Sequence, residues 1–142
     1  MAIGDVMRTR VVTVDADDSV RLSVLRMLEE GVGAVAVCDA GTLVGIFTER
    51  DVLALAGNGS DLDVVRVGDV MTRNPFTVDA SDAVLDAARL MGEKKIRHLP
   101  VVQGGHLLGM VGIRDVLGSL VQRLWDTHDT AAHETARALF KN

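Results

Sequence analysis

The chain has 142 residues, 48% hydrophobic, 25% charged and 3% aromatic, with a formal net charge of −5; this length fits one compact domain or two small ones that share a core. An acidic chain without a basic run is a poor candidate for binding nucleic acid, and no apolar stretch approaches the roughly 20 residues of a membrane span. The single cysteine, Cys38, excludes an intrachain disulfide, and we expect a soluble, cytoplasmic protein.

The first elements expected along the chain are a strand and a helix. Residues 11–14, Val-Val-Thr-Val, form a short β-branched run that is typical of a strand. Asp17-Asp18-Ser19 follows as a helix start that can cap the N–H groups of the first turn. Apolar residues then recur at helical spacing over residues 20–28, and Gly31 is placed to end this helix.

A hairpin and a second helix complete the first half of the chain. The apolar runs 34–38 and 43–48 flank Asp39-Ala40-Gly41, which is a turn signal between two antiparallel strands. The second helix begins at Glu49. A polar, glycine-rich stretch follows this helix, and we place the linker between the two halves at residues 61–67.

The second half of the chain repeats the first. A shift of 64 residues aligns the sequence with itself without a gap, so that Gly4-Asp5-Val6-Met7 falls on Gly68-Asp69-Val70-Met71. The same elements are therefore expected again: strands at 75–78, 99–102 and 107–111, a first helix opening at Ser81-Asp82, and a second helix from Ile113.

The repeat predicts an α/β fold of two tandem βαββα units that share one core and are related by a pseudo-two-fold axis. We expect repeat 1 at residues 1–60, the linker at 61–67, repeat 2 at 68–125 and a C-terminal helical tail at 126–142. This symmetry creates two equivalent clefts at the junction of the repeats. Clefts between modules are preferred sites for small molecules.

The segment from Gly45 to Asp51 carries the clearest chemical signal, because a strand runs directly into a helix there. Thr48 and Asp51 stand three residues apart at the helix start. A hydroxyl with backbone N–H groups suits an anionic oxygen, and a carboxylate at this place can accept both hydroxyls of a ribose. The same Thr-x-x-Asp pattern is also a capping box that needs no ligand, and taken alone it favours that alternative.

The repeat together with this segment resembles the CBS-domain family, named after cystathionine β-synthase. The resemblance covers residues 4–125 and rests on the Asp-Val-Met starts, on Ile96-Arg97-His98-Leu99-Pro100-Val101-Val102 and on the Gly-x-x-Thr-x-x-Asp segment. It implies a non-catalytic regulatory module that binds an adenosyl ligand (AMP, ADP, ATP or S-adenosylmethionine) between the repeats. In that family the Asp holds the ribose, the Thr faces phosphate, and the opposite copy supplies the base pocket and further phosphate contacts.

Carried over residue by residue, the resemblance implies one chemically complete cleft, here called the Asp51 cleft. Pro75 and Phe76 would cover a purine, and Lys95, Arg97 and His98 would donate to phosphate, Arg97 with two parallel hydrogen bonds. The ligand-binding residues expected for this cleft are Thr48, Arg50, Asp51, Pro75, Phe76, Lys95, Ile96, Arg97, His98 and Pro100.

Its symmetry mate, the Asp115 cleft, is expected to bind phosphate-bearing ligands more weakly, or only a neutral adenosine-like group. Gly112 stands where Thr48 stands in repeat 1, and Gly33-Ala34 stand where Arg97-His98 stand in repeat 2. The comparison of the copies leaves Arg114 as the only cationic donor. The residues expected to line this second, weaker cleft are Val11, Val12, Val32, Ala34, Arg114 and Asp115.

The expected partners are a small-molecule nucleotide and a separate regulated protein of unknown identity, in a stand-alone module. The family resemblance also implies a homodimer formed through the helices. No required cofactor, metal site or catalytic cluster is expected, since the histidines and the cysteine lack ligand spacing or an activating base. The alternative function is a protein-interaction or scaffold module whose clefts are empty.

Overall fold

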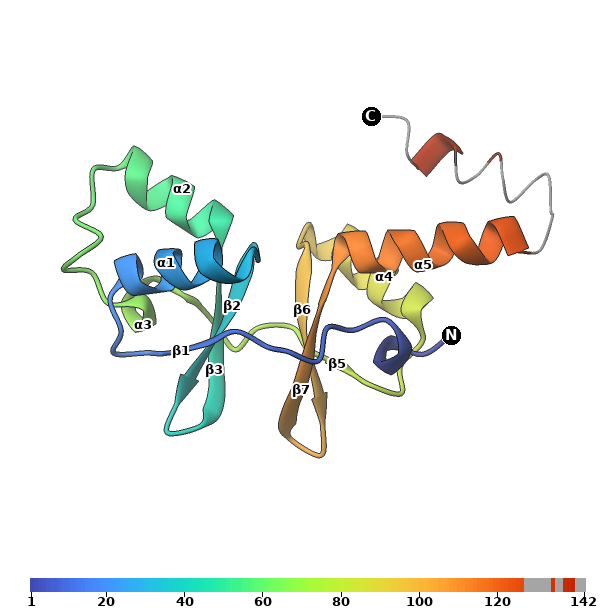
Figure 1. Cartoon of the computed structure of the whole chain (residues 1–142), viewed down its shortest axis with the longest axis horizontal. Coiled ribbons are helices and arrows are strands. Elements are labelled where there is room, and N and C mark those ends of the chain that lie inside the picture. The colour runs from blue at the N-terminus through green and yellow to red at the C-terminus, as the bar shows by residue number, and fades with distance from the viewer. Residues whose placement is uncertain (127–133, 135–136, 140–142) are drawn as a thin grey trace.

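A computed structural model describes residues 1–126, 134 and 137–139, and within them two βαββα units lie side by side (Figure 1). Repeat 1 contains β1 (Thr13–Asp15), α1 (Val20–Glu30), β2 (Ala34–Asp39), β3 (Thr42–Thr48) and α2 (Glu49–Gly57). Repeat 2 contains β5 (Val78–Asp79), α4 (Val84–Lys94), β6 (His98–Gln103), β7 (His106–Gly112) and α5 (Ile113–Asp126). The short elements η1 (Ile3–Asp5), α3 (Val67–Val70) and β4 (Thr72–Arg73) precede or join the repeats.

Each repeat builds a small mixed sheet with the same local topology. In repeat 1, β1 is parallel to β2, and β2 is antiparallel to β3; in repeat 2, β5 is parallel to β6, and β6 is antiparallel to β7. The turn between β2 and β3 has positive φ at Ala40 (47°) and Gly41 (81°). Two successive residues of this kind match the twist of a tight hairpin. The predicted α/β fold and its hairpins are therefore confirmed.

Helix α1 begins and ends as its sequence predicts. The Ser19 hydroxyl accepts a hydrogen bond of 3.1 Å from the backbone N–H of Leu22, which satisfies one of the free donors of the first turn. Gly31 adopts the left-handed conformation at the C-cap, with φ of 66°. Lys95 takes the same conformation after α4, with φ of 55°, although its side chain makes that conformation costly.

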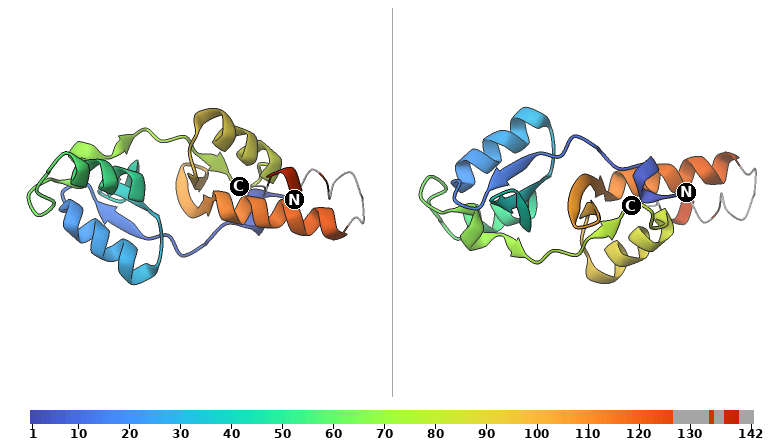
Figure 2. Two further views of the ribbon diagram at one scale, coloured as in Figure 1. Left: turned by 90° about the horizontal axis from the view of Figure 1, so that it is seen from above. Right: turned by 90° about the horizontal axis from the view of Figure 1, so that it is seen from below.

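The two repeats exchange their leading segments. Ile3 is fully buried in the core of repeat 2, and Val67, which is its equivalent in the second copy, is fully buried in the core of repeat 1. Figure 2 shows the two connecting segments crossing the junction on opposite sides. The start of each copy thus packs on the other copy, and the linker predicted at 61–67 ends inside α3, since Val67 is the first residue of that helix.

A small apolar cluster joins the two sheets. Ala34, Ala36 and Ile46 from repeat 1 pack with Met110 from repeat 2. Short side chains at Ala34 and Ala36 allow β2 to approach the facing sheet closely. Because the cluster is small, the junction retains open space beside it, and the clefts described below lie there.

Two boundaries differ from the sequence prediction. The strands predicted at 11–14 and 75–78 are β1 at Thr13–Asp15 and β5 at Val78–Asp79, since the residues before them cross the junction instead of pairing along the sheet. Helix α5 is described as far as Asp126, the first residue of the predicted tail. That tail lies almost entirely outside the described residues. In the described part of the chain, no helix is long and apolar enough to cross a membrane.

Candidate functional site: two clefts at the junction of the repeats

The Asp51 cleft is built where β3 runs into α2. Thr48 is the N-cap of α2, and its backbone N–H donates to Asp51 Oδ2 at 2.9 Å while its hydroxyl donates to the same oxygen at 3.3 Å. The capping arrangement that the sequence left open is therefore present. Within the described residues Asp51 Oδ1 accepts no hydrogen bond, so half of this carboxylate stays available.

The cavity beside this helix start has a volume of about 300 Å³ and draws residues from both repeats. The structure brings together nine of the ten residues predicted for the cleft: Thr48, Arg50, Asp51, Pro75, Phe76, Lys95, Ile96, Arg97 and His98. Pro100 does not line the cavity, because it is a fully buried residue of β6 that pairs with Met110 of β7.

Four lining residues of the Asp51 cleft were not predicted: Gly33, Ile46, Glu49 and Thr72. Thr72 lies on β4, beside Ile46 of β3. The family motifs do not mark these positions, since they depend on how the two repeats pack. The exchange of leading segments is what brings Thr72 against repeat 1.

Cations and an aromatic ring both line the Asp51 cleft. The side chains of Arg50, Lys95 and Arg97 make no hydrogen bond or ion pair with any other residue that the structure describes, so their side-chain donors remain free for a ligand. Phe76 is 50% exposed, and the Lys94 ammonium lies 5.1 Å from the centroid of its ring. This contact is close enough for a cation–π attraction that holds the ring in place.

The Asp115 cleft is the larger of the two, with a volume of about 600 Å³. It occupies the equivalent place where β7 runs into α5, and Asp115 Oδ2 accepts a hydrogen bond of 3.1 Å from the backbone N–H of Gly112. Five of the six residues predicted for it line the cavity: Val12, Val32, Ala34, Arg114 and Asp115. Val11 packs instead against the apolar cluster between the sheets.

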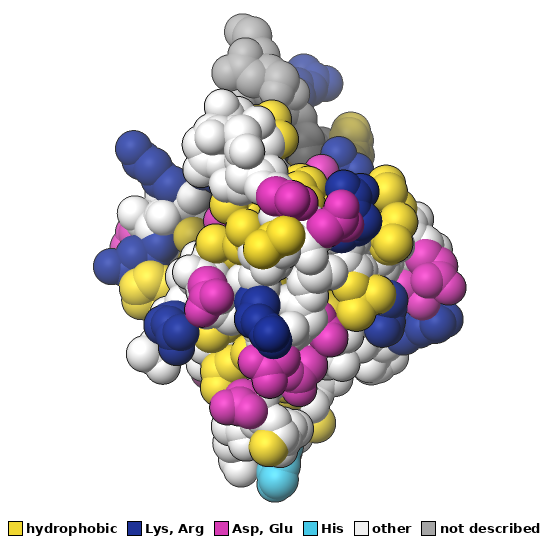
Figure 3. All heavy atoms as spheres, turned by 90° about the vertical axis from the view of Figure 1, so that its left-hand side faces the viewer, with side chains coloured by type: hydrophobic (Ala, Val, Ile, Leu, Met, Phe, Trp, Pro, Cys, Tyr) yellow, Lys and Arg dark blue, Asp and Glu magenta, His cyan; other side chains and the backbone are white. Residues whose placement is uncertain are grey.

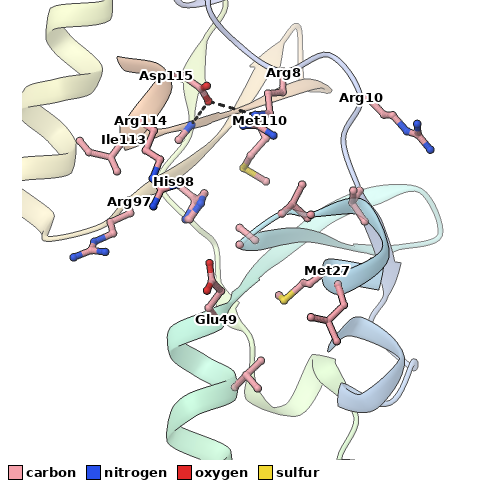
Figure 4. A pocket seen from close by; sticks show the side chains of 18 of the residues that line it. Arg8, Arg10, Met27, Glu49, Arg97, His98, Met110, Ile113, Arg114 and Asp115 are labelled. Atoms are coloured by element: carbon pink, nitrogen blue, oxygen red, sulfur yellow. Dashed lines mark hydrogen bonds and ion pairs between the residues drawn. The ribbon is translucent and has the colours of Figure 1, made fainter. Parts of the chain in front are cut away.

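The prediction that Arg114 is the only cationic donor of the Asp115 cleft is wrong. Arg8, Arg10, Arg97 and His98 line it as well, as Figure 4 shows. Arg8 and Arg10 lie outside the positions that, by the family resemblance, would contact phosphate. Arg8 and Arg10 stand at the positions equivalent to Thr72 and Asn74, in the segment that crosses the junction.

Arg8 is held at the mouth of this cleft by its backbone. Its N–H donates to the Met110 carbonyl at 2.9 Å, and the Met110 N–H donates to the Arg8 carbonyl at 3.0 Å. Its side chain extends to Asp115, with 3.7 Å between Nε and Oδ2, whereas Arg10 points away and pairs with Glu30 at 3.1 Å (Figure 4). Among the described residues Asp51 makes no such ion pair, since Thr72 stands at the position equivalent to Arg8.

A shared wall of Gly33, Glu49, Arg97 and His98 separates the two clefts. Burial lowers the pKa of His98 below its ordinary value, and the neighbouring Arg97 and Arg8 act in the same direction. The carboxylates of Glu49 and Asp115 oppose this shift without overcoming it. Near neutral pH, His98 is therefore expected to be an uncharged donor and acceptor instead of a cation.

Two sequence-related βαββα units with exchanged leading segments and paired clefts place this chain in the class of tandem-repeat modules with inter-repeat sites. The family model of the CBS domain matches the chain twice, over residues 3–58 and 67–122. The chain therefore belongs to the CBS-domain family, as its repeats and motifs predicted.

Known relatives include both proteins named for the domain and an enzyme. The mitochondrial CBS domain-containing protein CBSX3 of Arabidopsis thaliana is 36% identical over 132 residues, which cover 84% of this chain and 64% of that protein. Arabinose 5-phosphate isomerase KdsD of Yersinia pestis is 34% identical over 120 residues, which cover 82% of this chain but 37% of the enzyme. The chain thus spans less than two thirds of the length of these relatives.

Among solved structures, CBSX2 of Arabidopsis thaliana in complex with AMP is 34% identical, with a TM-score of 0.75. The similarity covers 86% of this chain and 97% of that one. A CBS pair of the same size and fold is thus known with an adenosine nucleotide bound.

Proposed function

We propose that this CBS-domain pair is a regulatory module that binds an adenosyl ligand, AMP, ADP, ATP or S-adenosylmethionine, in the Asp51 cleft. The observation that carries this proposal is the convergence of Thr48 and Asp51 from repeat 1 with Phe76, Lys95 and Arg97 around one cavity. The AMP complex of a relative that is 34% identical supports the same ligand class.

Each group in the cleft has a chemical task in this proposal. Asp51 accepts the ribose hydroxyls through the oxygen that does not cap α2. The Thr48 hydroxyl and the first N–H groups of α2 face the phosphate, where the positive end of the helix dipole favours an anion. Lys95 and Arg97 add charge-assisted hydrogen bonds, and the exposed Phe76 ring stacks on the purine.

Regulation follows because the ligand touches both repeats. A nucleotide that bridges α2 and the start of β6 favours one relative packing of the repeats over another, and the small apolar cluster between the sheets offers little resistance. The shift transmitted to a separate partner protein cannot exceed the difference in ligand affinity between the two packings. We propose no catalytic step for this module.

A thermal-shift scan with AMP, ADP, ATP, S-adenosylmethionine and NAD tests the proposal. A ligand at a hundred times its dissociation constant stabilises the folded state by about 2.7 kcal/mol, which corresponds to roughly 7–11 °C for a chain of this size. Asp51→Ala abolishes this shift and Asp115→Ala preserves it. No shift with any ligand, or a shift that depends on Asp115 alone, contradicts the proposal.

We also propose that the module forms a homodimer through its helices. Leu25 on α1 and Leu53 on α2 are 53% and 74% exposed, and Figure 3 shows several hydrophobic patches among charged side chains at the end formed by repeat 1. Light scattering on the wild type and on a Leu25→Glu/Leu53→Glu variant tests this. A dimer that becomes a monomer in the variant is expected; a wild-type monomer contradicts it.

A further inference from the structure

The wall between the two clefts holds an ionisable pair whose counterpart in the pseudo-symmetric position is apolar. Glu49 is the first residue of α2 and His98 is the first residue of β6, and each lines both clefts. The shift of 64 residues places Glu49 on Ile113 and Ala34 on His98. Because the equivalent pair is Ala34 and Ile113, the scaffold does not need ionisable side chains at this place.

The backbone fixes where the two side chains lie. The Glu49 N–H donates to the Gly33 carbonyl at 3.0 Å, and a Cβ on Gly33 would collide with Glu49 Oε1, so the carboxylate lies directly over this glycine. His98 pairs with Gly112 across the hairpin of β6 and β7, and a Cβ on Gly112 would lie 3.7 Å from the ring carbon Cδ2 of His98. Two glycines thus leave room for the carboxylate and the ring.

The Glu49 carboxylate points from repeat 1 toward the His98 ring of repeat 2 (Figure 4). Within the described residues, neither side chain makes a hydrogen bond or an ion pair. The negative charge of Glu49 nonetheless favours the protonated form of His98. A protonated His98 can therefore form a charged contact with Glu49 across the junction of the repeats.

The protein's own groups leave the balance at His98 in favour of the neutral ring. Burial lowers the pKa of His98, and the cations Arg97 and Arg8 act in the same direction. The carboxylates of Glu49 and Asp115 oppose this shift without overcoming it. The remaining charged residues that line the clefts are one carboxylate and four cations: Asp51, Arg10, Arg50, Lys95 and Arg114. A further negative charge within about 4–6 Å of the ring would raise the pKa again.

We infer that His98 takes up a proton from solution when a nucleotide phosphate binds in the Asp51 cleft, and that the imidazolium then links this phosphate to Glu49. Both nitrogens of the charged ring are donors, so one serves the phosphate and the other faces the carboxylate. The inference rests on the proposed function and adds a dependence on pH, because the ligand and the proton each strengthen the binding of the other. The link also ties repeat 2 to repeat 1, so the proton adds to the hold of the ligand on their packing.

NMR titration of the four histidine rings, with and without AMP, tests the inference. AMP is expected to raise the pKa of His98 by about one unit or more, with the signal assigned by its loss in His98→Gln. The AMP affinity of the wild type, relative to that of His98→Gln, should therefore rise roughly tenfold as the pH falls from 8 to 5.5. The comparison with His98→Gln removes the titration of the AMP phosphate itself, which falls near pH 6.

Matched variants separate this effect from a general change of charge. His106→Gln removes an exposed ring that lines neither cleft and should leave the response to AMP unchanged. Glu49→Gln should lower the pKa of His98 in the AMP complex. Glu29→Gln removes the same charge from an exposed site on α1 that lines neither cleft, and it should change that pKa by less than about 0.3.

The outcomes separate the inference from the proposed function. If AMP binds and the pKa of His98 stays the same or falls, the inference is overturned and the proposed function is left intact. Equal effects of Glu49→Gln and Glu29→Gln on the pKa of His98 overturn the link through Glu49. Absence of AMP binding to the wild type at every pH from 5.5 to 8 overturns both the proposed function and the inference.

Discussion

The Asp51 and Asp115 clefts have equivalent backbone arrangements and differ in where their charged side chains lie. Both place a carboxylate three residues after a strand-to-helix junction, and in both it accepts a backbone N–H. Arg97 lines both clefts; the Asp51 cleft adds Lys95 and Arg50, whereas the Asp115 cleft adds arginines from the crossing segment and from α5. Duplication thus preserved the scaffold while the crossing segments, Arg8 to Arg10 and Thr72 to Asn74, diverged.

The largest expected effects lie in the two cores, which differ at equivalent positions. Phe47 and Val111 are both fully buried. Phe47→Ala should lower the free energy of unfolding by about 3–5 kcal/mol, and Val111→Ala by about 2 kcal/mol, because fewer buried groups are removed. Urea denaturation measures both losses, with the exposed Val64→Ala as a control within about 0.5 kcal/mol. Equal losses would show that the cores do not differ as described.

The crossing segments can be displaced one at a time through two equivalent glycines. A Cβ on Gly109 would lie 2.7 Å from the Arg8 carbonyl oxygen, and one on Gly45 would lie 2.8 Å from the Thr72 carbonyl oxygen. Each Gly→Ala change should lower the free energy of unfolding by about 1–3 kcal/mol, which urea denaturation measures.

The matched control for these glycine variants lies in α5. A Cβ on Gly118 meets nothing within 4 Å, so Gly118→Ala should stabilise the helix by about 0.5–1 kcal/mol. If Gly109→Ala is as well tolerated as Gly118→Ala, the backbone pairing of Arg8 with Met110 does not hold the segment in place.

Arg50 and Arg114 occupy equivalent positions, and each lines only its own cleft. Arg50→Gln should weaken AMP binding roughly tenfold, or by about 1.4 kcal/mol, and Arg114→Gln should leave it unchanged. Calorimetric titration of both variants with AMP measures the change. Equal weakening by the two variants would argue against the Asp51 cleft as the AMP site.

The smallest expected effect is the pH dependence that His98 contributes at the shared wall. Because its pKa is lowered in the folded state, the unfolded chain binds more protons between that pKa and the ordinary value near 6.5. Above about pH 6.5, His98 does not lower the free energy of unfolding. As the pH falls further, protonation of His98 in the unfolded chain lowers that free energy. Melting curves from pH 7.5 to 5 should show the wild type losing stability relative to His98→Gln. Parallel curves for the two proteins would contradict the assigned shift.

Much of the fold could be predicted from sequence because repetition makes local signals reinforce one another. The cap at Ser19, the stop at Gly31 and the turn at Ala40-Gly41 are short-range patterns. The stop and the turn have counterparts with positive φ in the second copy, whereas Ala83, the equivalent of Ser19, makes no side-chain cap. The exchange of Ile3 and Val67 between the cores could not be predicted, since either core accepts an apolar side chain of that size. Contacts between distant segments decide which core receives it.

The same distinction between short-range patterns and contacts of distant segments explains which residues of the candidate sites could be predicted. Thr48, Asp51 and the run from Lys95 to His98 belong to motifs, and their convergence follows from the pseudo-symmetry. Pro100 shares the motif but is fully buried on β6 opposite Met110 of β7, so it does not reach the cavity. Arg8 lies outside any motif, and its contact with Asp115 depends on how the crossing segment packs on repeat 2.

A crystal structure of the protein with one equivalent of AMP tests the central claim, that similar backbones hold two different clefts, most directly. The account predicts AMP in the Asp51 cleft, with the ribose hydroxyls on Asp51 and the phosphate near Thr48, Lys95 and Arg97, and with the Arg8–Asp115 ion pair intact. AMP bound on Asp115 with Arg8 displaced, or bound equally in both clefts, would contradict it.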